Sequence, residues 1–356
     1  MGKLILAINP GSTSTKISVY EDKKEVFTKT LRHSGEELAP YKSIIDQLDF
    51  RTDTIKAALA ENHINLKDLA VIVGRGGLVK PIPSGVYEVN QAMINDIKEG
   101  KNGEHASNLG AIIANNLAKE VGGIKALIAD PVVVDELEPI ARISGLAGIQ
   151  RMSIFHALNQ KAIAKLYAAD HNKKYNELNL IVAHLGGGVS VGIHSKGRVI
   201  DVNDALRGEG PFSPERSGGL PAAAVADLCF SGEYTKGQIK KMIAGEGGVI
   251  SYLGTNSFSE VEKRVDQGDK EAILISDAFA YQLAKEIGAM ATVVDGKVDA
   301  ILLTGGIAYN TPLMEKVKQK VGFIAPVSLY PGEDEMGALA GNGLAVLNGT
   351  EEIQVY

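Results

Sequence analysis

The chain has 356 residues, a formal net charge of −6, no tryptophan and a single cysteine. The negative charge and the lack of aromatic stacking surfaces argue against nucleic-acid binding. Cys229 has no partner for a disulfide or a thiolate metal site, so we expect a buried thiol. No apolar run approaches the ~18 residues of a membrane span, and no secretory signal precedes the first apolar segment. We therefore predict a cytoplasmic protein of two domains, with no nucleic-acid or membrane partner.

Residues 1–31 predict three strands joined by short polar turns. An apolar run at 4–8 ends at Asn9 and leads into Pro-Gly-Ser-Thr-Ser-Thr-Lys at 10–16, and two further β-branched runs follow. Glycine and small hydroxyl residues after a strand let backbone N–H groups approach an anion, because no large side chain blocks them. The segment is a candidate phosphate turn, and an ordinary hairpin is the alternative.

Two later strands end in residues suited to a ligand site. Helical patterns at 36–48 and 53–63 precede a strand expected at 69–74. This strand ends in Gly-Arg-Gly-Gly, which places Arg75 where it can reach into a cleft. The strand expected at 126–129 ends in Asp130 and a proline. Ligands collect outside the carboxyl ends of strands in α/β folds. For both residues the alternative is an ordinary turn position. An amphipathic helix is expected between these strands, with His105 in its first turn.

A second strand triplet follows a helix predicted at 157–169. The apolar run 178–183 leads into His184, three glycines at 186–188 and two further β-like runs. This pattern repeats that of the N-terminus about 175 residues later, and it predicts a duplicated α/β protein whose halves each offer a phosphate turn.

The repeat suggests where the domains begin and end. Domain I is predicted at 1–155 and domain II at 156–333, and the C-terminal segment 334–356 is expected to pack back on domain I as a helix. Glu335 lies in the first turn of that helix, where the helix dipole favours acidic side chains.

Domain II contains a long loop and a third glycine turn. The loop at 205–221 is rich in glycine and proline and carries Arg216, and loops of this length in compact domains are usually functional. A helix at 269–290 has apolar residues at the four-residue spacing of a core face. The strand expected at 300–303 ends in Thr-Gly-Gly-Ile.

These features together indicate phosphoryl transfer, although no standard nucleotide motif occurs. The segment 11–16 lacks the second glycine of a Walker A loop, and there is no dinucleotide fingerprint or protein-kinase signature. The chain offers instead three strand-ending glycine turns, two arginines and two acids. Phosphoryl transfer requires such backbone donors and cations around the transferring group, and carboxylates for a metal ion.

Five segments resemble the acetate kinase family of acyl kinases, and the resemblance extends over nearly the whole chain. They are Asn9–Lys16, Phe155-His156, His184–Ser190, Arg216–Gly218 and Thr304–Ile307. Three further stretches, 103–110, 155–161 and 214–218, are most similar to the butyrate-phosphorylating branch. The resemblance implies the duplicated fold of actin, sugar kinases and heat-shock chaperones, with ribonuclease H-like halves. It also implies transfer of the γ-phosphoryl of ATP to butyrate, giving butanoyl phosphate and ADP, with Mg²⁺.

The same resemblance assigns roles to individual residues. Those expected to act on the reacting groups are Arg75, Asp130, His156, His184 and Arg216. Those expected to hold Mg²⁺ or its waters are Asn9, Asp130 and Glu335. Those expected to bind the nucleotide are Asn9, Gly11, Ser12, Ser14, Lys16, Gly186, Gly187, Gly188, Gly305, Gly306 and Ile307. A homodimer or larger homo-oligomer is implied as well.

The chain departs from the family at two places. Arg75 directly precedes a glycine pair, whereas the family arginine lies a few residues ahead of a His-Gly-Gly. Ser257 and Ser259 stand where relatives carry Asp and Arg near the nucleotide, and Ser259 is expected to cap a helix that follows. Uncharged hydroxyls make weaker contacts than charged groups, so weaker ATP binding is expected.

Two alternatives remain open at the level of sequence. The first is a kinase for another short or branched acid, such as acetate, propionate or isobutyrate, because scattered apolar side chains build the acyl pocket. The second is a non-catalytic ATP-binding switch of the actin or chaperone type. The arginine pair argues for the kinase, since a switch has no carboxylate substrate to bind.

Overall fold

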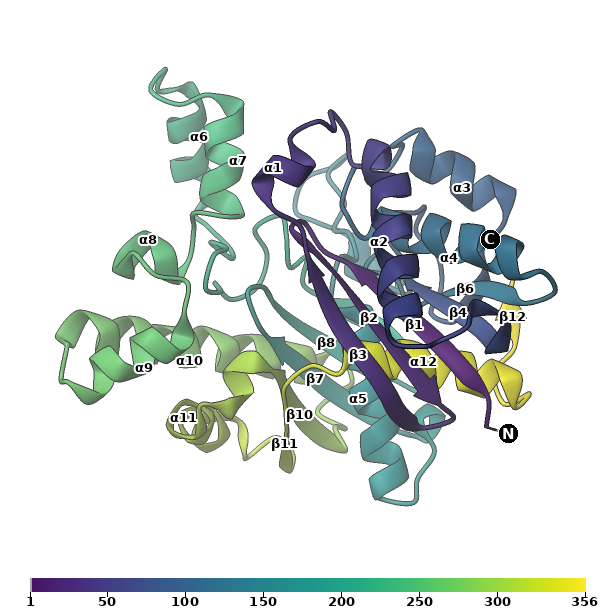
Figure 1. The fold of residues 1–356 in the computed structure, drawn as a ribbon. Coiled ribbons are helices and arrows are strands. Elements are labelled where there is room, and N and C mark those ends of the chain that lie inside the picture. The colour runs from purple at the N-terminus through teal and green to yellow at the C-terminus, as the bar shows by residue number, and fades with distance from the viewer. Residues whose placement is uncertain (1) are drawn as a thin grey trace. The chain divides into compact units, whose positions relative to one another are not determined.

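The computed structural model describes residues 2–356, and the chain divides into two compact units (Figure 1). Unit 1 extends to Val134 and resumes at Asp334–Tyr356, and unit 2 is Asp135–Glu333. The predicted domain boundary after residue 155 stays a prediction, since compactness alone does not define an independently folding domain. Within unit 1, the C-terminal segment contributes both a helix and an edge strand.

Unit 1 is built on a seven-stranded sheet in the order β12-β5-β6-β4-β1-β2-β3. Its strands are β1 (Leu4–Pro10), β2 (Ser14–Glu21), β3 (Lys24–Arg32), β4 (Leu69–Arg75), β5 (Val86–Glu88), β6 (Lys125–Ala129) and β12 (Ile353–Gln354). β1, β2 and β3 form an antiparallel meander, and β1, β4 and β6 are parallel. The carboxyl ends of the three parallel strands therefore meet at one edge of the sheet.

Helices cover both faces of this sheet. They are α1 (Gly35–Leu38), α2 (Leu48–Glu61), α3 (Gln91–Lys98), α4 (Asn108–Val121) and α12 (Glu335–Leu347). The core that contains Leu6, Ile8 and Ile72 packs against α2 and α4. α12 covers the opposite face, where a Cβ on Gly343 would lie only 2.7 Å from Val73 Cγ2. Successive strand residues face opposite sides of a sheet, so the continuous apolar runs of β1 and β4 bury both faces.

Unit 2 repeats the arrangement on a five-stranded sheet in the order β11-β10-β7-β8-β9. The strands are β7 (Asn179–Leu185), β8 (Val189–Ser195), β9 (Arg198–Val202), β10 (Ala300–Gly305) and β11 (Val327–Pro331). β7, β8 and β9 form a second antiparallel meander, and β7, β10 and β11 are parallel. Both units thus contain a three-stranded antiparallel meander whose first strand pairs with a parallel strand, which is the duplication that the sequence predicts.

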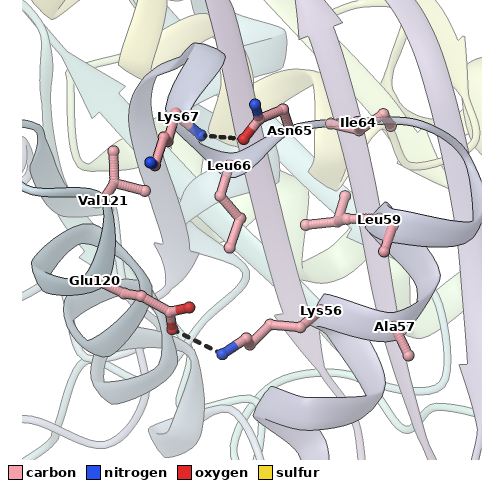
Figure 2. Close-up of a pocket in the computed structure, with 10 residues that line it drawn as sticks. Lys56, Ala57, Leu59, Ile64, Asn65, Leu66, Lys67, Glu120 and Val121 are labelled. Atoms are coloured by element: carbon pink, nitrogen blue, oxygen red, sulfur yellow. Dashed lines mark hydrogen bonds and ion pairs between the residues drawn. The ribbon is translucent and has the colours of Figure 1, made fainter.

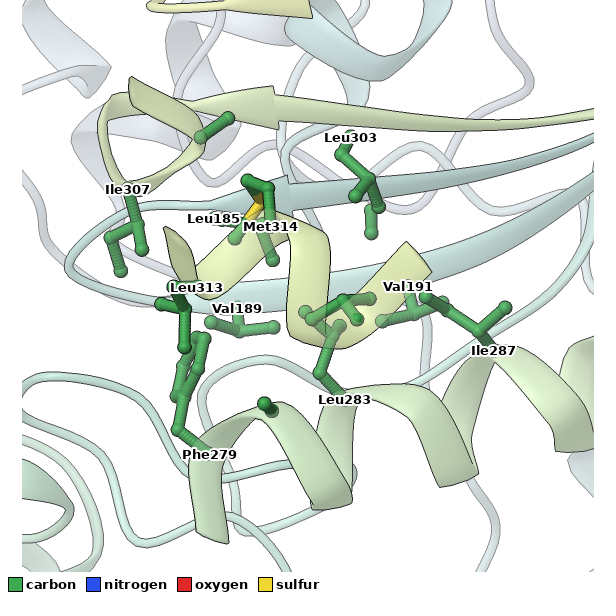
Figure 3. Close-up of a cluster of buried hydrophobic side chains, with 14 of the residues drawn as sticks. Leu185, Val189, Val191, Phe279, Leu283, Ile287, Leu303, Ile307, Leu313 and Met314 are labelled. Carbon is green, nitrogen blue, oxygen red and sulfur yellow. The ribbon is translucent and has the colours of Figure 1, made fainter. Parts of the chain in front are cut away.

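The two faces of the second sheet have separate cores. The helices of this unit are α5 (Ala157–Asp170), α6 (Ala222–Phe230), α7 (Lys236–Ile243), α8 (Val249–Leu253), α9 (Phe258–Asp266), α10 (Lys270–Thr292) and α11 (Thr311–Val321). Figure 3 shows Phe279, Leu283 and Ile287 of α10 against the side chains of Val189 and Val191 of β8. α5 packs on the other face. The four-residue apolar spacing of α10 is therefore a core face, as predicted.

Short 3-10 turns complete the two units. They are Ile45–Gln47, Leu66–Asp68, Pro139–Arg142, Tyr175–Glu177 and Gly306–Tyr309.

Four local predictions are wrong. The helix predicted at 36–48 is reduced to α1 and the 3-10 turn Ile45–Gln47. Cys229 is exposed, because no side chain of its apolar helix α6 is buried. α4 begins at Asn108, so His105 precedes the helix and bonds through Nδ1 to Ser107. Ser259 is no helix cap: α9 begins at Phe258, and the Ser259 hydroxyl lies 3.0 Å from that of Ser257.

A buried ion pair anchors α5 and provides a stability test. Lys161 is 1% exposed, and its Nζ bonds to Glu136 Oε2 at 2.7 Å and to the Gly197 carbonyl at 3.0 Å. We expect Lys161→Met to lower the free energy of unfolding by about 3–5 kcal/mol, because it removes the cation that balances the largely buried Glu136 carboxylate.

Urea denaturation measures this change. Adding Glu136→Gln to the Lys161→Met variant should recover most of the loss, because the amide oxygen can still accept from Val199 N. Lys174→Met, at an exposed lysine, is the control. A double variant as unstable as the single one would show that packing, and not charge, sets the loss.

Candidate functional site

In unit 1, three predicted site residues follow adjacent strands at the same sheet edge. Ile8 of β1 pairs with Gly74 of β4, so Asn9 is adjacent to Arg75. Arg75 pairs in turn with Ala129 of β6, the residue before Asp130. The parallel register thus brings together positions that lie far apart in the sequence.

Arg75, Glu335 and Asn9 are in direct contact. Arg75 Nη2 lies 3.1 Å from Glu335 Oε1, and Arg75 Nη1 donates to Asn9 Oδ1 at 3.2 Å. Asn9 Nδ2 donates to Glu335 Oε2 at 2.5 Å. Glu335 is the first residue of α12, so a helix N-terminus presents this carboxylate to the strand ends. The result is a charge-balanced group of oxygen and nitrogen atoms that remains partly open to solvent.

Asp130 is held separately from this group. Its carboxylate is 3% exposed, and Oδ1 accepts from Ser84 Oγ at 2.6 Å and from Gly85 N at 2.9 Å. Its φ of +37° is unusual for a residue other than glycine. Such backbone strain gathers at functional sites, and here it accompanies a carboxylate at a strand end.

The predicted phosphate turn lies between β1 and β2. Gly11 N donates to Ser14 O at 2.7 Å and closes the turn, and Ser12 is exposed. Lys16 is exposed on β2, where it pairs in register with Asn9. Sequence reasoning missed Arg51 of α2, which bonds to this turn through three carbonyls. The sequence feature that could have indicated its role is an arginine within a helical pattern that also carries apolar residues.

In unit 2, His184 is the penultimate residue of β7 and contacts three other side chains. It is 2% exposed, with Nδ1 2.8 Å from Asn159 Oδ1 and Nε2 3.2 Å from Glu333 Oε1. The His156 ring stacks on it with a centroid separation of 3.8 Å and an interplanar angle of 12°. The two predicted histidines therefore form one structural group. Asn159 and Glu333 were missed, because their contacts join distant parts of the chain.

His156 also begins a buried polar chain. Its Nδ1 lies 2.9 Å from Ser190 Oγ, which accepts from Gln160 Nε2 at 2.8 Å. Gln160 Oε1 lies 3.0 Å from His194 Nε2. Burial lowers the pKa of His194 well below its usual value, so this ring is neutral at physiological pH. These hydrogen-bonded side chains hold His156 in one orientation from within the core.

The second glycine turn lies against Arg216. A Cβ on Gly188 would lie 2.0 Å from Arg216 Nη1, so only glycine admits the guanidinium in this position. Arg216 Nη1 donates to the Ala205 carbonyl at 2.8 Å. Burial lowers the pKa of Arg216, and the charges of Glu215 and Asp204 oppose this shift. The arginine remains protonated, and it lies at the second glycine turn.

The third glycine turn follows β10. Gly305 has φ of +90° and exchanges backbone hydrogen bonds with Gly332 at 3.1 and 2.9 Å. A Cβ on Gly306 would meet nothing within 4 Å, so the backbone there is open. The Ile307 side chain, in contrast, is buried in the core of unit 2.

Two surface pockets lie apart from these residues. Figure 2 shows the first, of about 550 Å³, where the Lys56–Glu120 ion pair joins α2 and α4. The second, of about 710 Å³, lies between α10 and α11. None of the predicted site residues lines either pocket.

Residues 2–356 lack a membrane-spanning helix and a metal-binding side-chain cluster. No helix in this part of the chain has the length and apolar character to cross a membrane. These residues also contain no group of three or more His, Cys, Asp or Glu side chains that could hold a metal ion.

Comparison with known proteins agrees with these features. Residues 143–325 match the model of the acetokinase family. Butyrate kinases 2 and 1 of Clostridium acetobutylicum are 56% and 57% identical over 352 residues, which is 99% of this chain and of each relative. The crystal structure of Porphyromonas gingivalis acetate kinase superposes with a TM-score of 0.81 at 18% identity, and covers 97% of this chain and 100% of that one. The predicted fold class is confirmed, and the chain belongs to the acetokinase family.

Proposed function

We propose that this protein transfers the γ-phosphoryl group of ATP to butyrate and forms butanoyl phosphate and ADP. The observation that carries the proposal is the identity of more than half the residues with two butyrate kinases over 99% of the chain. The arginines, acids and glycine turns at strand ends in both units support it. Phosphoryl transfer relies on such positioning and charge neutralisation.

The two arginines address the main obstacle of the reaction. A carboxylate is already ionised at pH 7, so the acceptor needs no general base. The difficulty is the approach of two anions, which fixed cations relieve in the transition state. We assign Arg75 and Arg216 to the acid and the transferring phosphoryl group. His184 and His156 are assigned to the phosphoryl oxygens. For His184 this requires Nε2 to exchange Glu333 for a phosphoryl oxygen, because both of its ring nitrogens have partners.

The glycine turns are assigned to the nucleotide. In unit 1 the turn from Gly11 to Ser14, with Asn9 and Lys16 beside it, supplies donors to the phosphates. In unit 2 the turn at 186–188 does the same, and the turn at 305–307, whose backbone is open at Gly306, borders the adenosine. This division explains why both copies of the meander carry small residues after their first strand.

The donor set of unit 1 fits Mg²⁺. Magnesium prefers oxygen ligands, and is typically held by one or two carboxylates together with substrate phosphates and waters. Asn9, Asp130 and Glu335 present such oxygens near the same sheet edge. When bound, the ion would neutralise charge on the phosphates. ATP or ADP would supply the remaining ligands.

Loss of one metal-binding carboxylate is a further test. We expect Glu335→Gln to raise the Mg²⁺ concentration for half-maximal rate at least about tenfold, because a neutral amide is a weaker ligand for a hard cation. Magnesium titration of the initial rate measures the effect. Glu351→Gln, elsewhere in the C-terminal segment, is the control. If the variant instead loses thermal stability and keeps its Mg²⁺ dependence, Glu335 does not bind the metal and serves only as the ion-pair partner of Arg75.

A hydroxamate assay for acyl phosphate tests the function itself. Linear and branched C2–C6 acids are supplied with ATP and Mg²⁺, and butyrate is expected to give the highest kcat/KM. A higher value for acetate, propionate or a branched acid would replace butyrate as the substrate. ATP binding without any acyl phosphate would favour a nucleotide-dependent switch.

We also propose a homodimer or larger homo-oligomer. Unit 2 leaves several large apolar side chains exposed, among them Ile140 at 83% and Phe230 at 91%. Contiguous exposed apolar surface is typical of subunit contacts. Light scattering coupled to size-exclusion chromatography distinguishes this from a monomer of 37.7 kDa.

A further inference from the structure

Arg51 is a buried cation that has no carboxylate partner among residues 2–356. It projects from α2 and is fully buried, yet all six of its hydrogen bonds go to neutral oxygens. Burying a cation in this way is costly, and an apolar residue of similar volume is often the more stable choice. Its contacts therefore suggest a task beyond packing.

Most of these contacts go to the predicted phosphate turn. Arg51 Nη1 donates to Gly11 O at 2.8 Å and to Ser14 O at 2.9 Å, and Nη2 donates to Ser12 O at 3.0 Å. The remaining carbonyl of the turn, that of Thr13, accepts from His33 N at 2.8 Å. Three carbonyls of residues 11–14 therefore accept from Arg51, and the fourth accepts from His33 N, just after β3.

The fixed carbonyls determine where the backbone N–H groups point. In a planar trans peptide the N–H of one residue points opposite to the C=O of the residue before it. Because the carbonyls of Gly11 and Ser12 face Arg51, the N–H groups of Ser12 and Thr13 face away from it. Both residues are exposed, and neither N–H donates within residues 2–356. Two adjacent outward donors of this kind form an anion-binding turn.

The surroundings hold the guanidinium in one orientation. Gln47 Oε1 accepts from Nε at 3.0 Å and from Nη2 at 2.8 Å, and Thr15 Oγ1 accepts from Nη1 at 3.0 Å. Thr15 Oγ1 also contacts His33 Nε2 at 2.9 Å. Burial and then the charge of Arg51 lower the pKa of His33, which disfavours a second positive charge beside Arg51. Its five N–H groups all have acceptors.

We propose that Arg51 is a positioning residue that turns the carbonyls of residues 11–14 inward and so aims the Ser12 and Thr13 N–H groups at a nucleotide phosphate. Its positive charge lies behind the same peptide groups and polarises them, which strengthens their N–H groups as donors. The inference rests on the proposed function only in naming the anion as a phosphate of ATP.

The test compares a triphosphate with a nucleoside in the full-length protein. Calorimetry gives the Kd of AMP-PNP, and adenosine is measured as a competitor, for the natural chain, Arg51→Lys and the milder Gln47→Met. A lysine keeps the charge but loses the planar fork that bonds three carbonyls. Leu59→Ala, which removes a buried side chain from the same helix, is the matched control for loss of stability.

We expect Arg51→Lys to weaken AMP-PNP at least about tenfold, the effect of roughly one lost hydrogen bond to a charged group. Adenosine should bind unchanged, Gln47→Met should show a smaller loss, and Leu59→Ala should lower only the melting temperature. Amide NMR signals of Ser12 and Thr13 should shift with AMP-PNP in the natural chain and not in Arg51→Lys.

Other outcomes would overturn the proposal. If folded Arg51→Lys and Gln47→Met bind AMP-PNP normally, Arg51 serves only to attach α2 to the sheet. Equal losses for AMP-PNP and adenosine would likewise point to a general structural role. Failure of the natural chain to form butanoyl phosphate would reject the proposed function separately, because the binding comparison requires no turnover.

Discussion

Replacing Arg216 by alanine is expected to lower kcat about 10³-fold, the scale of an arginine that stabilises a transferring phosphoryl group. Among residues 2–356, its guanidinium donates one hydrogen bond, to the Ala205 carbonyl. The remaining N–H groups of this partly buried cation are thus available to substrate. ATP affinity should change far less, because the interaction strengthens mainly in the transition state. Steady-state kinetics and ATP calorimetry separate the two effects.

A matched control lies in the same loop. Arg207 has a side chain that is 55% exposed, and Arg207→Ala should leave kcat within about twofold, as substitutions at exposed positions usually do. Arg216→Lys should recover only part of the rate, because an ammonium group lacks the planar fork. Nearly normal turnover of Arg216→Ala would place this arginine outside the site and leave its loop a structural role.

Gly188→Ala is expected to have an effect close to that of Arg216→Ala, about 10²–10³-fold in kcat. The new Cβ would lie 2.0 Å from Arg216 Nη1 and 2.6 Å from Cζ, so the guanidinium must move away from the turn. Gly188 is not among the glycines with positive φ, so alanine can adopt its backbone conformation. The loss would therefore come from displacement of the arginine.

A double-mutant cycle tests this explanation. If Gly188→Ala acts only through Arg216, the Gly188→Ala/Arg216→Ala variant should be as slow as Arg216→Ala alone, because residues in contact are not additive. Fully additive losses would mean that Gly188 has its own role toward the phosphates. Normal activity of Gly188→Ala would show that the guanidinium can rearrange without cost.

The amino-acid sequence by itself determined the repeated strand triplets, the three glycine turns and the residues that follow strands β1, β4, β6 and β7. These features depend on local patterns: alternation or continuous apolar runs within a strand, and small residues where the backbone must turn. The sequence indicates that Arg75 and Asp130 lie at strand ends, where ligands collect in α/β folds. The parallel pairing of β1, β4 and β6 then brings Asn9, Arg75 and Asp130 to one edge of the sheet.

Only the tertiary structure decided which side chains hold those residues in place. Arg51 lies 40 positions from Gly11, and Asn159 and Glu333 reach His184 from different elements. Such contacts leave no periodic trace, because one long-range hydrogen bond constrains a single pair of residues. The exposure of Cys229 has the same origin: an apolar helix predicts burial, but only the positions of the other elements decide whether anything covers it.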